Sequence, residues 1–278
     1  MLPAPAAFVE VDDVKKLKKC AGCEDVRYCS VECQRKHRPE HKQACKKRAA
    51  ELRDEILFKQ PESSYLGDCP ICCLPLSIDP PKSTMMGCCS TVICDGCEHA
   101  NKLREERECL ENSCPFCRHP LPKSNEEAEF NRMKRVEAND PVALRQTGCM
   151  SSVEGKFKTA FKYLTKAAEL GDADAHHVLS VSYLNGEGVT KDMKKAAYHA
   201  EEAAIRGHPA ARFNLGGIEW NNGTIGRNIS MMERAAKHWV IAANLGHDEA
   251  MKMVKTCYSK RLVSKEDLPQ LFVHIRLL

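Results

Sequence analysis

The sequence has no long hydrophobic run and no large excess of one charge. No stretch approaches the roughly 18 consecutive apolar residues that cross a bilayer, and the opening MLPAPAAFVEVDD lacks the basic head and apolar run of a signal peptide. The 42 basic and 38 acidic side chains leave a net charge of only +4, without the basic stripe of a nucleic-acid binder. We therefore expect a cytoplasmic or nuclear protein with no membrane partner, and protein rather than nucleic acid as its partner.

The sequence also lacks the common catalytic motifs. It contains no phosphate-binding glycine loop, no nucleophile elbow and no HExxH pair. These absences argue against an enzyme with a covalent active site of its own.

Cysteine, by contrast, is abundant and unevenly placed. Of the 17 cysteines, all but Cys149 and Cys257 lie between Cys20 and Cys117. A reducing compartment disfavours disulfides, so closely spaced cysteines are expected to be metal ligands. The first part of the chain is therefore predicted to fold around metal.

The last part of the chain repeats itself. The segments AAELGDADA, AAIRGHPAA and AANLGHDEA superimpose, with glycines at 171, 207 and 246 and matching alanines at 175, 211 and 250. Spacings of 36 and 39 residues between these glycines are typical of stacked helix pairs, in which glycine ends the first helix in a left-handed cap. The insert of three residues is expected in a loop around NNGTIGRN.

The first cysteine group has the spacing Cx2Cx5Cx3Cx7Hx3C, and Tyr28 stands just before the third cysteine. This pattern resembles that of the MYND zinc finger. The resemblance implies one closed, structural zinc site, formed by Cys20, Cys23, His41 and Cys45. It also implies a docking module, since relatives bind short proline-containing peptides.

The match to the MYND pattern is partial. The family's other zinc needs an upstream CxxC, and residues 1–19 contain no cysteine, so Cys29 and Cys33 are left as two ligands. Either the finger works with one metal or the chain lacks residues that its relatives have. His37 is a candidate replacement ligand, although a solvated surface histidine is the commoner case.

The second cysteine group consists of four pairs in order: Cys69 and Cys72, Cys88 and Cys89, Cys94 and Cys97, and Cys114 and Cys117. This order resembles the RING finger. In that family the first and third pairs share one zinc and the second and fourth pairs share another. The resemblance implies one site from Cys69, Cys72, Cys94 and Cys97, and one from Cys88, Cys89, Cys114 and Cys117. Because Cys88 and Cys89 are adjacent, one of them could be replaced by His99 or Cys109. We expect three zinc ions in the chain, with Cys73 and any unused Cys109 packing as small hydrophobes.

A RING finger implies ubiquitin-ligase activity, and such a finger catalyses ubiquitin transfer by positioning the reactants. Such a finger holds a ubiquitin-conjugating enzyme near a substrate and does no covalent chemistry itself. By resemblance, Ile71 and Pro115 would contact the conjugating enzyme, and Arg118 would hydrogen-bond to the donor ubiquitin. The charged segment between Cys97 and Cys114 is predicted to be a helix and lacks the tryptophan often found in that groove. A non-enzymatic, zinc-stabilised interaction domain is therefore the alternative.

The repeats resemble Sel-type repeats, relatives of the tetratricopeptide repeats. The loop LNGEGVTKD and the alanine spacing that follows carry this resemblance, which implies a curved array whose concave face binds protein partners. His176 and His177 are adjacent on one predicted helix and point to different faces, so we expect surface and core packing rather than a metal site.

These interpretations predict small zinc-stabilised α+β fingers followed by an all-α helical-repeat solenoid. Ser124 with Glu127 forms a predicted capping box for a linker helix, and Ser264 could cap a C-terminal helix. The expected parts are 1–60, a partial MYND finger and helix; 68–122, a RING finger; 123–139, a helical linker; 140–260, Sel-type repeats; and 261–278, a capping helix or tail. The function is then that of a ubiquitin ligase whose repeats recruit a substrate, or of a non-enzymatic adaptor or scaffold.

Overall fold

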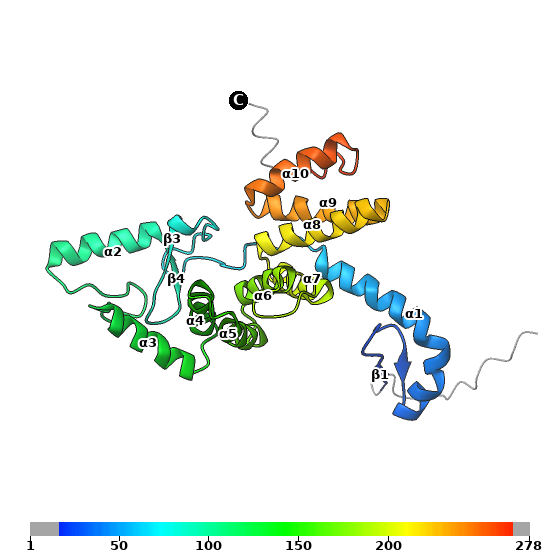
Figure 1. Ribbon diagram of the computed structural model, residues 1–278, viewed down its shortest axis with the longest axis horizontal. Helices are drawn as coiled ribbons and strands as arrows, with labels where there is room; N and C mark the ends of the chain where they lie inside the picture. Colours follow the sequence, from blue (N-terminus) through cyan, green and yellow to red (C-terminus); the bar gives the residue numbers. More distant parts are fainter. Residues whose placement is uncertain (1–16, 269–278) are drawn as a thin grey trace, which may run out of the picture. The chain divides into compact units, whose positions relative to one another are not determined.

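The computed structural model describes residues 17–268 and separates into two compact units, Met1–Lys59 and Gln60–Leu278 (Figure 1). Small α+β fingers are followed by a stack of helices, which confirms the expected fold class. Within the described range, no helix combines the length and the apolar run that a bilayer crossing requires.

The first unit is a two-stranded hairpin followed by one long helix. Strands β1 (Lys18–Lys19) and β2 (Arg27–Tyr28) pair antiparallel, and α1 runs from Val31 to Leu57. The Ser30 hydroxyl caps α1 by accepting the N–H of Cys33, at 3.1 Å. The buried cluster of the finger is very small and consists of Cys20, Cys23 and Tyr28. So little apolar burial cannot hold a fold by itself, which favours stabilisation by metal.

The second unit begins with another small finger. It contains the 3₁₀ turn η2 (Pro80–Lys82), the antiparallel strands β3 (Ser83–Met85) and β4 (Val92–Cys94), and helix α2 (Asp95–Glu108). Its core consists of two cysteines with three apolar side chains: Cys69, Leu76, Met86, Ile93 and Cys114. The expected charged helix is present as α2.

The linker helix is also present, as α3 (Asn125–Glu137). The Ser124 hydroxyl accepts the N–H of Glu127 at 3.2 Å, and the Glu127 carboxylate accepts the N–H of Lys123 at 2.8 Å. Val136 at the end of α3 packs into the core of the first repeat helices. The linker is therefore part of the helical stack.

Seven helices form the repeats, and consecutive helices pack against one another (Figure 1). They are α4 (Pro141–Val153), α5 (Phe157–Glu169), α6 (Ala173–Asn185), α7 (Met193–Ile205), α8 (Pro209–Ile225), α9 (Ile229–Asn244) and α10 (Asp248–Ser259). The repeated alanines Ala175, Ala211 and Ala250 are fully buried, which lets neighbouring helices approach closely. Gly171, Gly207 and Gly246 have φ of 91°, 83° and 92°, so the left-handed caps are confirmed.

The sequence had suggested that the insert of three residues lies in a loop, and the structure shows that this prediction is wrong. The insert lengthens α8 to 17 residues and α9 to 16, where α6 and α7 have 13 each. Most of NNGTIGRN is therefore helical, because three or four added residues complete one more turn. The extension leaves Ile225 and Ile229 exposed at its tip, at 85% and 65%.

The finger of the second unit contacts the repeats directly. The Ser90 hydroxyl donates to the Asp140 carboxylate at 2.5 Å, and Arg135 donates to the carbonyl of Gly87. The Tyr65 ring stacks on His208 with centroids 4.5 Å apart. The first two contacts hold the finger against the start of the helical stack, and the third joins the segment before the finger to α8.

The chain after α10 returns to the last helices. Val263 and Leu268 pack with the core of α9 and α10, and the Ser264 hydroxyl and N–H both bond to the Asp267 carboxylate. The capping helix expected to follow Ser264 lies mainly in residues 269–278, outside the described residues.

Candidate metal centres

Three groups of four side chains each bring their ligand atoms within 4.8 Å of one another. The groups are Cys20, Cys23, His41 and Cys45; Cys69, Cys72, Cys94 and Cys97; and Cys88, Cys89, Cys114 and Cys117. They contain the twelve residues that the sequence predicted as ligands, divided as predicted.

The first group joins the hairpin to the long helix. Cys20 and Cys23 come from the turn between β1 and β2, while His41 and Cys45 lie one helical turn apart on α1. The Sγ atoms of Cys20 and Cys45 are 3.7 Å apart, and Cys23 Sγ lies 3.2 Å from His41 Nε2. Such separations are close to those between ligands around one tetrahedral ion.

His37, the candidate replacement ligand, has a different partner. Its Nδ1 lies 3.0 Å from the hydroxyl of Tyr28, and its ring stacks on that of His41. It belongs to none of the three groups. His37 therefore supports the group from outside by packing against a ligand.

The electrostatics of the first group suit a cation. The backbone N–H groups of Gly22 and Cys23 and the side chain of His41 lower the pKa of Cys20 to about 6, whereas burial and the neighbouring thiols raise the pKa of Cys45 to about 11. One thiolate therefore forms easily, and its charge opposes ionisation of the next. A divalent cation removes that opposition, because it stabilises every thiolate of the set at once.

The other two groups are interleaved along the chain. The first pair, Cys69 and Cys72, meets the third pair, and the second pair meets the fourth. Two sulfur separations describe them: 3.7 Å between Cys72 and Cys94, and 3.3 Å between Cys88 and Cys117. Interleaving ties two loops to one small core.

The adjacent residues Cys88 and Cys89 both join the third group. They lie in a tight turn, where the Met86 carbonyl accepts the N–H of Cys89 and of Ser90, and Ser90 has φ of 59°. This turn directs both thiols toward the Cys114 loop, with Cys89 Sγ 3.9 Å from Cys114 Sγ. His99 and Cys109 are not needed to complete the set.

The thiols of the second group show the same contrast as those of the first. Although burial opposes it, backbone N–H groups of Cys94, Cys72 and Ile71 lower the pKa of Cys69 to about 6. Burial and the surrounding thiols raise the pKa of Cys97 to about 12. All three groups thus fit zinc, which would be held by four protein ligands and supply structural stability rather than a reactive position.

Two cysteines differ from the sequence prediction. Cys73 and Cys109 were expected to pack as small hydrophobes, but both are exposed. Each has a left-handed backbone, with φ of 57° and 51°, because Cys73 follows the CPIC turn and Cys109 ends α2. These turns point the two side chains to solvent.

The residues predicted to contact a conjugating enzyme lie on the two finger loops. Ile71 is 43% exposed, Pro115 is partly exposed, and the exposed Arg118 donates to Asn101 Oδ1 at 3.1 Å. The sequence reasoning missed Leu74 and Phe116, which are 63% and 48% exposed beside the same loops. Their positions in the sequence, Leu74 next to CPIC and Phe116 inside CPFC, could have indicated that they lie on these loops.

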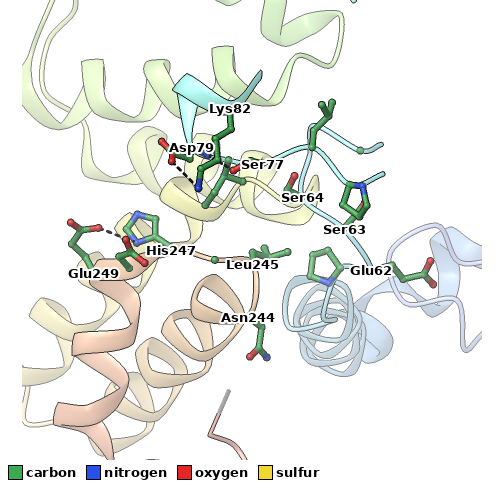
Figure 2. Close-up of a pocket in the computed structure, with 17 residues that line it drawn as sticks. Glu62, Ser63, Ser64, Ser77, Asp79, Lys82, Asn244, Leu245, His247 and Glu249 are labelled. Carbon is green, nitrogen blue, oxygen red and sulfur yellow. Dashed lines mark hydrogen bonds and ion pairs between the residues drawn. The ribbon is translucent and has the colours of Figure 1, made fainter. Parts of the chain in front are cut away.

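The second unit has a cavity of 630 Å³ between the finger and the repeats (Figure 2). Lys82 pairs with Asp79 at 3.3 Å, and His247 lies 3.6 Å from Glu249. Together with Glu62, these carboxylates make the wall mainly acidic. The cavity can therefore receive a polar or basic segment of a partner.

The first unit has a groove of 440 Å³ along one face of α1. Arg35, Arg38 and Lys42 line it, and their spacing of three and four residues places them on the same side of the helix. Val31 stands at its edge, 60% exposed. The groove combines basic and apolar side chains, which suits a peptide.

His176 and His177 take no part in a group of three or more metal-ligating side chains among residues 17–268. His176 is buried with its Nδ1 3.0 Å from that of His199, and the ring of His177 packs on His208. Both histidines therefore pack within the repeats, whereas the sequence predicted one at the surface and one in the core.

Cysteine-rich fingers followed by a stack of helical repeats suggest a protein-interaction module. Residues 10–45 match the family model of the MYND finger, and residues 152–172, 173–208 and 209–247 match that of the Sel1 repeat. The chain thus carries a MYND finger, which implies zinc binding, and Sel1 repeats, which suggest protein partners. No curated protein matches this chain.

Two solved structures are similar to part of this chain. One is a Sel1 repeat protein from Oxalobacter formigenes, 22% identical, with a TM-score of 0.46, covering 62% of this chain and 67% of that one. The other is c5321, described as a protective antigen present in uropathogenic Escherichia coli strains and displaying an SLR fold. It is 23% identical, with a TM-score of 0.42, covering 62% of this chain and 35% of that one.

Proposed function

We propose that this protein assembles partner proteins, with residues 68–122 acting as a RING-type ubiquitin-ligase module and the repeats recruiting the substrate. The observation that supports it best is the interleaved pairing of the two cysteine groups in residues 69–117. In this proposal each group holds one zinc, and a third zinc lies in the MYND finger.

The surface of the finger supports recruitment of a conjugating enzyme. The apolar side chains of Ile71, Leu74 and Phe116 are exposed on the two loops that the cysteine groups tie together. Exposed apolar side chains held rigidly at neighbouring positions are suited to bind a partner, because little conformational entropy is lost on binding. The module would act by holding the conjugating enzyme near the substrate.

The position of Arg118 suits the role that the resemblance implies, which is to hydrogen-bond to the donor ubiquitin. It follows the last cysteine of the third group, with a left-handed backbone at φ of 63°. Its guanidinium bonds to Asn101 on α2, which orients it and leaves further N–H donors. A carbonyl of the donor ubiquitin could accept one of those donors.

The repeats would supply the substrate site on their concave face, with the acidic cavity of Figure 2 as a second contact surface. Contacts such as Ser90 with Asp140 would keep the finger at a fixed distance from that site. A fixed distance favours transfer of ubiquitin to those substrate lysines that lie within reach of the bound conjugating enzyme.

Ubiquitin-chain formation by the zinc-loaded full chain tests the proposal. We expect chains with at least one enzyme from a panel of conjugating enzymes, and a loss of about tenfold for Ile71→Ala, since removing one central apolar contact costs about 1–2 kcal/mol of binding. Val153→Ala, at a residue that is 90% exposed in the repeats, is the matched control and should keep full activity. Zinc content must be unchanged in both variants.

The alternative is a non-enzymatic adaptor whose modules each hold a partner. It is favoured by α2, which contains no tryptophan and presents mainly charged side chains. An absence of ubiquitin chains with the whole panel, or equal activity of the two variants, would refute the ligase and leave the adaptor.

A further inference from the structure

The turn that carries Cys88 and Cys89 is an unusual ligand turn, because its two thiols are adjacent. The cysteines of a zinc-finger pair are typically separated by about two to four residues, whereas no residue separates these two. Ser90 completes the turn with φ of 59°, a left-handed conformation that is uncommon for a residue with a side chain. Bonds from outside the turn are therefore needed to hold this shape.

Two side chains of the helical stack supply such bonds, one on each side of the cysteines. The Ser90 hydroxyl donates to Oδ2 of Asp140 at 2.5 Å, and Nη1 of Arg135 donates to the Gly87 carbonyl. Arg135 lies in the last turn of α3, and Asp140 is the cap of α4. Because the adjacent cysteines lie between Gly87 and Ser90, the helical stack holds both ends of the ligand turn.

The two side chains that hold the turn are themselves fixed. They are 13% and 23% exposed and form an ion pair, with Arg135 Nε 3.3 Å from Asp140 Oδ2. The other carboxylate oxygen, Oδ1, accepts the N–H groups of Val142 and Ala143 at 2.9 and 3.1 Å. Asp140 thus caps α4 with one oxygen and binds the finger turn with the other.

The second loop of the same metal group is positioned by the finger itself. The buried Glu105 carboxylate accepts the N–H and the hydroxyl of Ser113 at 3.0 and 2.7 Å, and Asn101 donates to the Ser113 carbonyl at 3.1 Å. Ser113 directly precedes the ligand Cys114. The third group therefore joins one loop that α2 holds to one loop that the helical stack holds.

The neighbouring second group has positioning bonds among its own residues. The N–H of Cys94 donates to Cys69 Sγ at 3.5 Å, and the N–H of Cys97 donates to Cys94 Sγ at 3.4 Å. The second group is therefore an internal reference for the third.

We propose that Arg135 and Asp140 are positioning residues for the third metal group, so that the affinity of this group for zinc depends on the helical stack. Partners that orient ligands from outside commonly affect metal affinity strongly. The inference rests on the proposal that this group holds zinc and not on ligase activity. Because such coupling is reciprocal, zinc in this group in turn stabilises the contact between the finger and α4.

Asp140→Asn separates the positioning role from helix capping. Asparagine caps a helix about as well as aspartate, so Oδ1 keeps its bonds to α4. The amide nitrogen that replaces Oδ2 only donates, so it cannot accept a bond from Ser90 or Arg135. We expect the zinc affinity of the third group to fall about tenfold, the lower end of the range for such partners. Asp192→Asn is the matched control, because Asp192 caps α7 through the same kind of bonds.

Cysteine labelling reports on each group separately. Trypsin releases residues 60–82, with two ligands of the second group, and residues 108–118, with two ligands of the third. Each peptide also contains one exposed cysteine outside the groups, Cys73 or Cys109. The full chain is equilibrated in buffers of falling free-zinc concentration, labelled with N-ethylmaleimide, digested and weighed. A peptide should carry one label while its group holds zinc and three labels once the zinc is lost.

In Asp140→Asn, we expect peptide 108–118 to gain labels at a free-zinc concentration about tenfold higher than in wild type, with peptide 60–82 unchanged. Asp192→Asn should match wild type in both peptides. Ser90→Ala removes the same bond from the finger side and should shift peptide 108–118 in the same direction. The double variant should then bind zinc no more weakly than Asp140→Asn alone.

Two kinds of result would overturn the inference. If Asp140→Asn leaves peptide 108–118 at the wild-type midpoint, or shifts both peptides equally, the positioning role is wrong while the proposed zinc sites stand. Three labels on peptide 108–118 of the wild type at every zinc concentration would show that the third group holds no zinc. That result would overturn the proposed zinc site together with this inference.

Discussion

Two neighbouring glycines of α8 should respond to the same substitution in opposite ways. Gly216 faces α9, and a Cβ added there would lie 2.6 Å from Nε1 of Trp239 and 2.9 Å from its Cδ1. Gly217 faces open space, with nothing within 4 Å of an added Cβ. Gly216→Ala and Gly217→Ala are therefore a matched pair.

The magnitudes follow from three contributions. Alanine in place of glycine favours a helix by about 1 kcal/mol at either position. At Gly216 the Trp239 ring must retreat by roughly 1 Å, since ordinary carbon contacts lie near 3.5–4.0 Å, and such overpacking costs about 1–3 kcal/mol. The retreat also strains the bond from Trp239 Nε1 to the Phe213 carbonyl, 3.1 Å long, whose loss costs about 1 kcal/mol or more.

We therefore expect Gly216→Ala to lower the free energy of unfolding by about 2 kcal/mol and Gly217→Ala to raise it by about 0.5–1 kcal/mol. In a chain of this size, 1 kcal/mol shifts the melting temperature by about 2–4 °C. Thermal unfolding followed by helical circular dichroism, at fixed zinc concentration, measures both variants. If Gly216→Ala melts at or above wild type, or if both variants are equally destabilised, the proposed packing of α8 on α9 is wrong.

Native mass spectrometry should count three zinc ions per chain, and Cys20→Ser should remove one and spare the other two; a wild-type count of one or two would eliminate at least one metal site. Asp140→Ala should lower the free energy of unfolding by about 1–2 kcal/mol, because Asp140 caps α4 and also binds Ser90 and Arg135. Asp192→Ala removes the cap of α7 and should lower it by about 1 kcal/mol. Equal losses in urea unfolding would show that the Ser90 and Arg135 contacts contribute nothing. Despite burial, the Ser90 bond and nearby N–H groups lower the pKa of Asp140, so its contribution should be present at neutral pH and disappear as the pH falls below the ordinary value of 3.8.

Much of the local structure could be predicted from short stretches of sequence. The left-handed caps at Gly171, Gly207 and Gly246 and the cap at Ser124 depend on residues within a few positions. Local conformation is set by such neighbours, so one sequence suffices to predict it. The same holds for the ligand pairs, because CxxC spacing places two thiols on one turn.

Other features could not be predicted because distant residues decide them. The participation of both Cys88 and Cys89 depends on where the Cys114 loop lies, and the extra turn of α8 is supported by α9, where Met232 packs against Gly223. The exposure of Cys73 and Cys109 depends on the direction of turns that end against the finger core. Spacing alone carries no information about these directions.

The sequence by itself determined which cysteine pairs could hold metal and where a glycine ends the first helix of each repeat, since both depend on residues close together in the chain. Only the tertiary structure decided that the finger contacts the repeats through Tyr65 and His208, and that Cys88 and Cys89 both join the third group. Those outcomes depend on how separate elements pack, and packing is a property of the whole chain rather than of any segment.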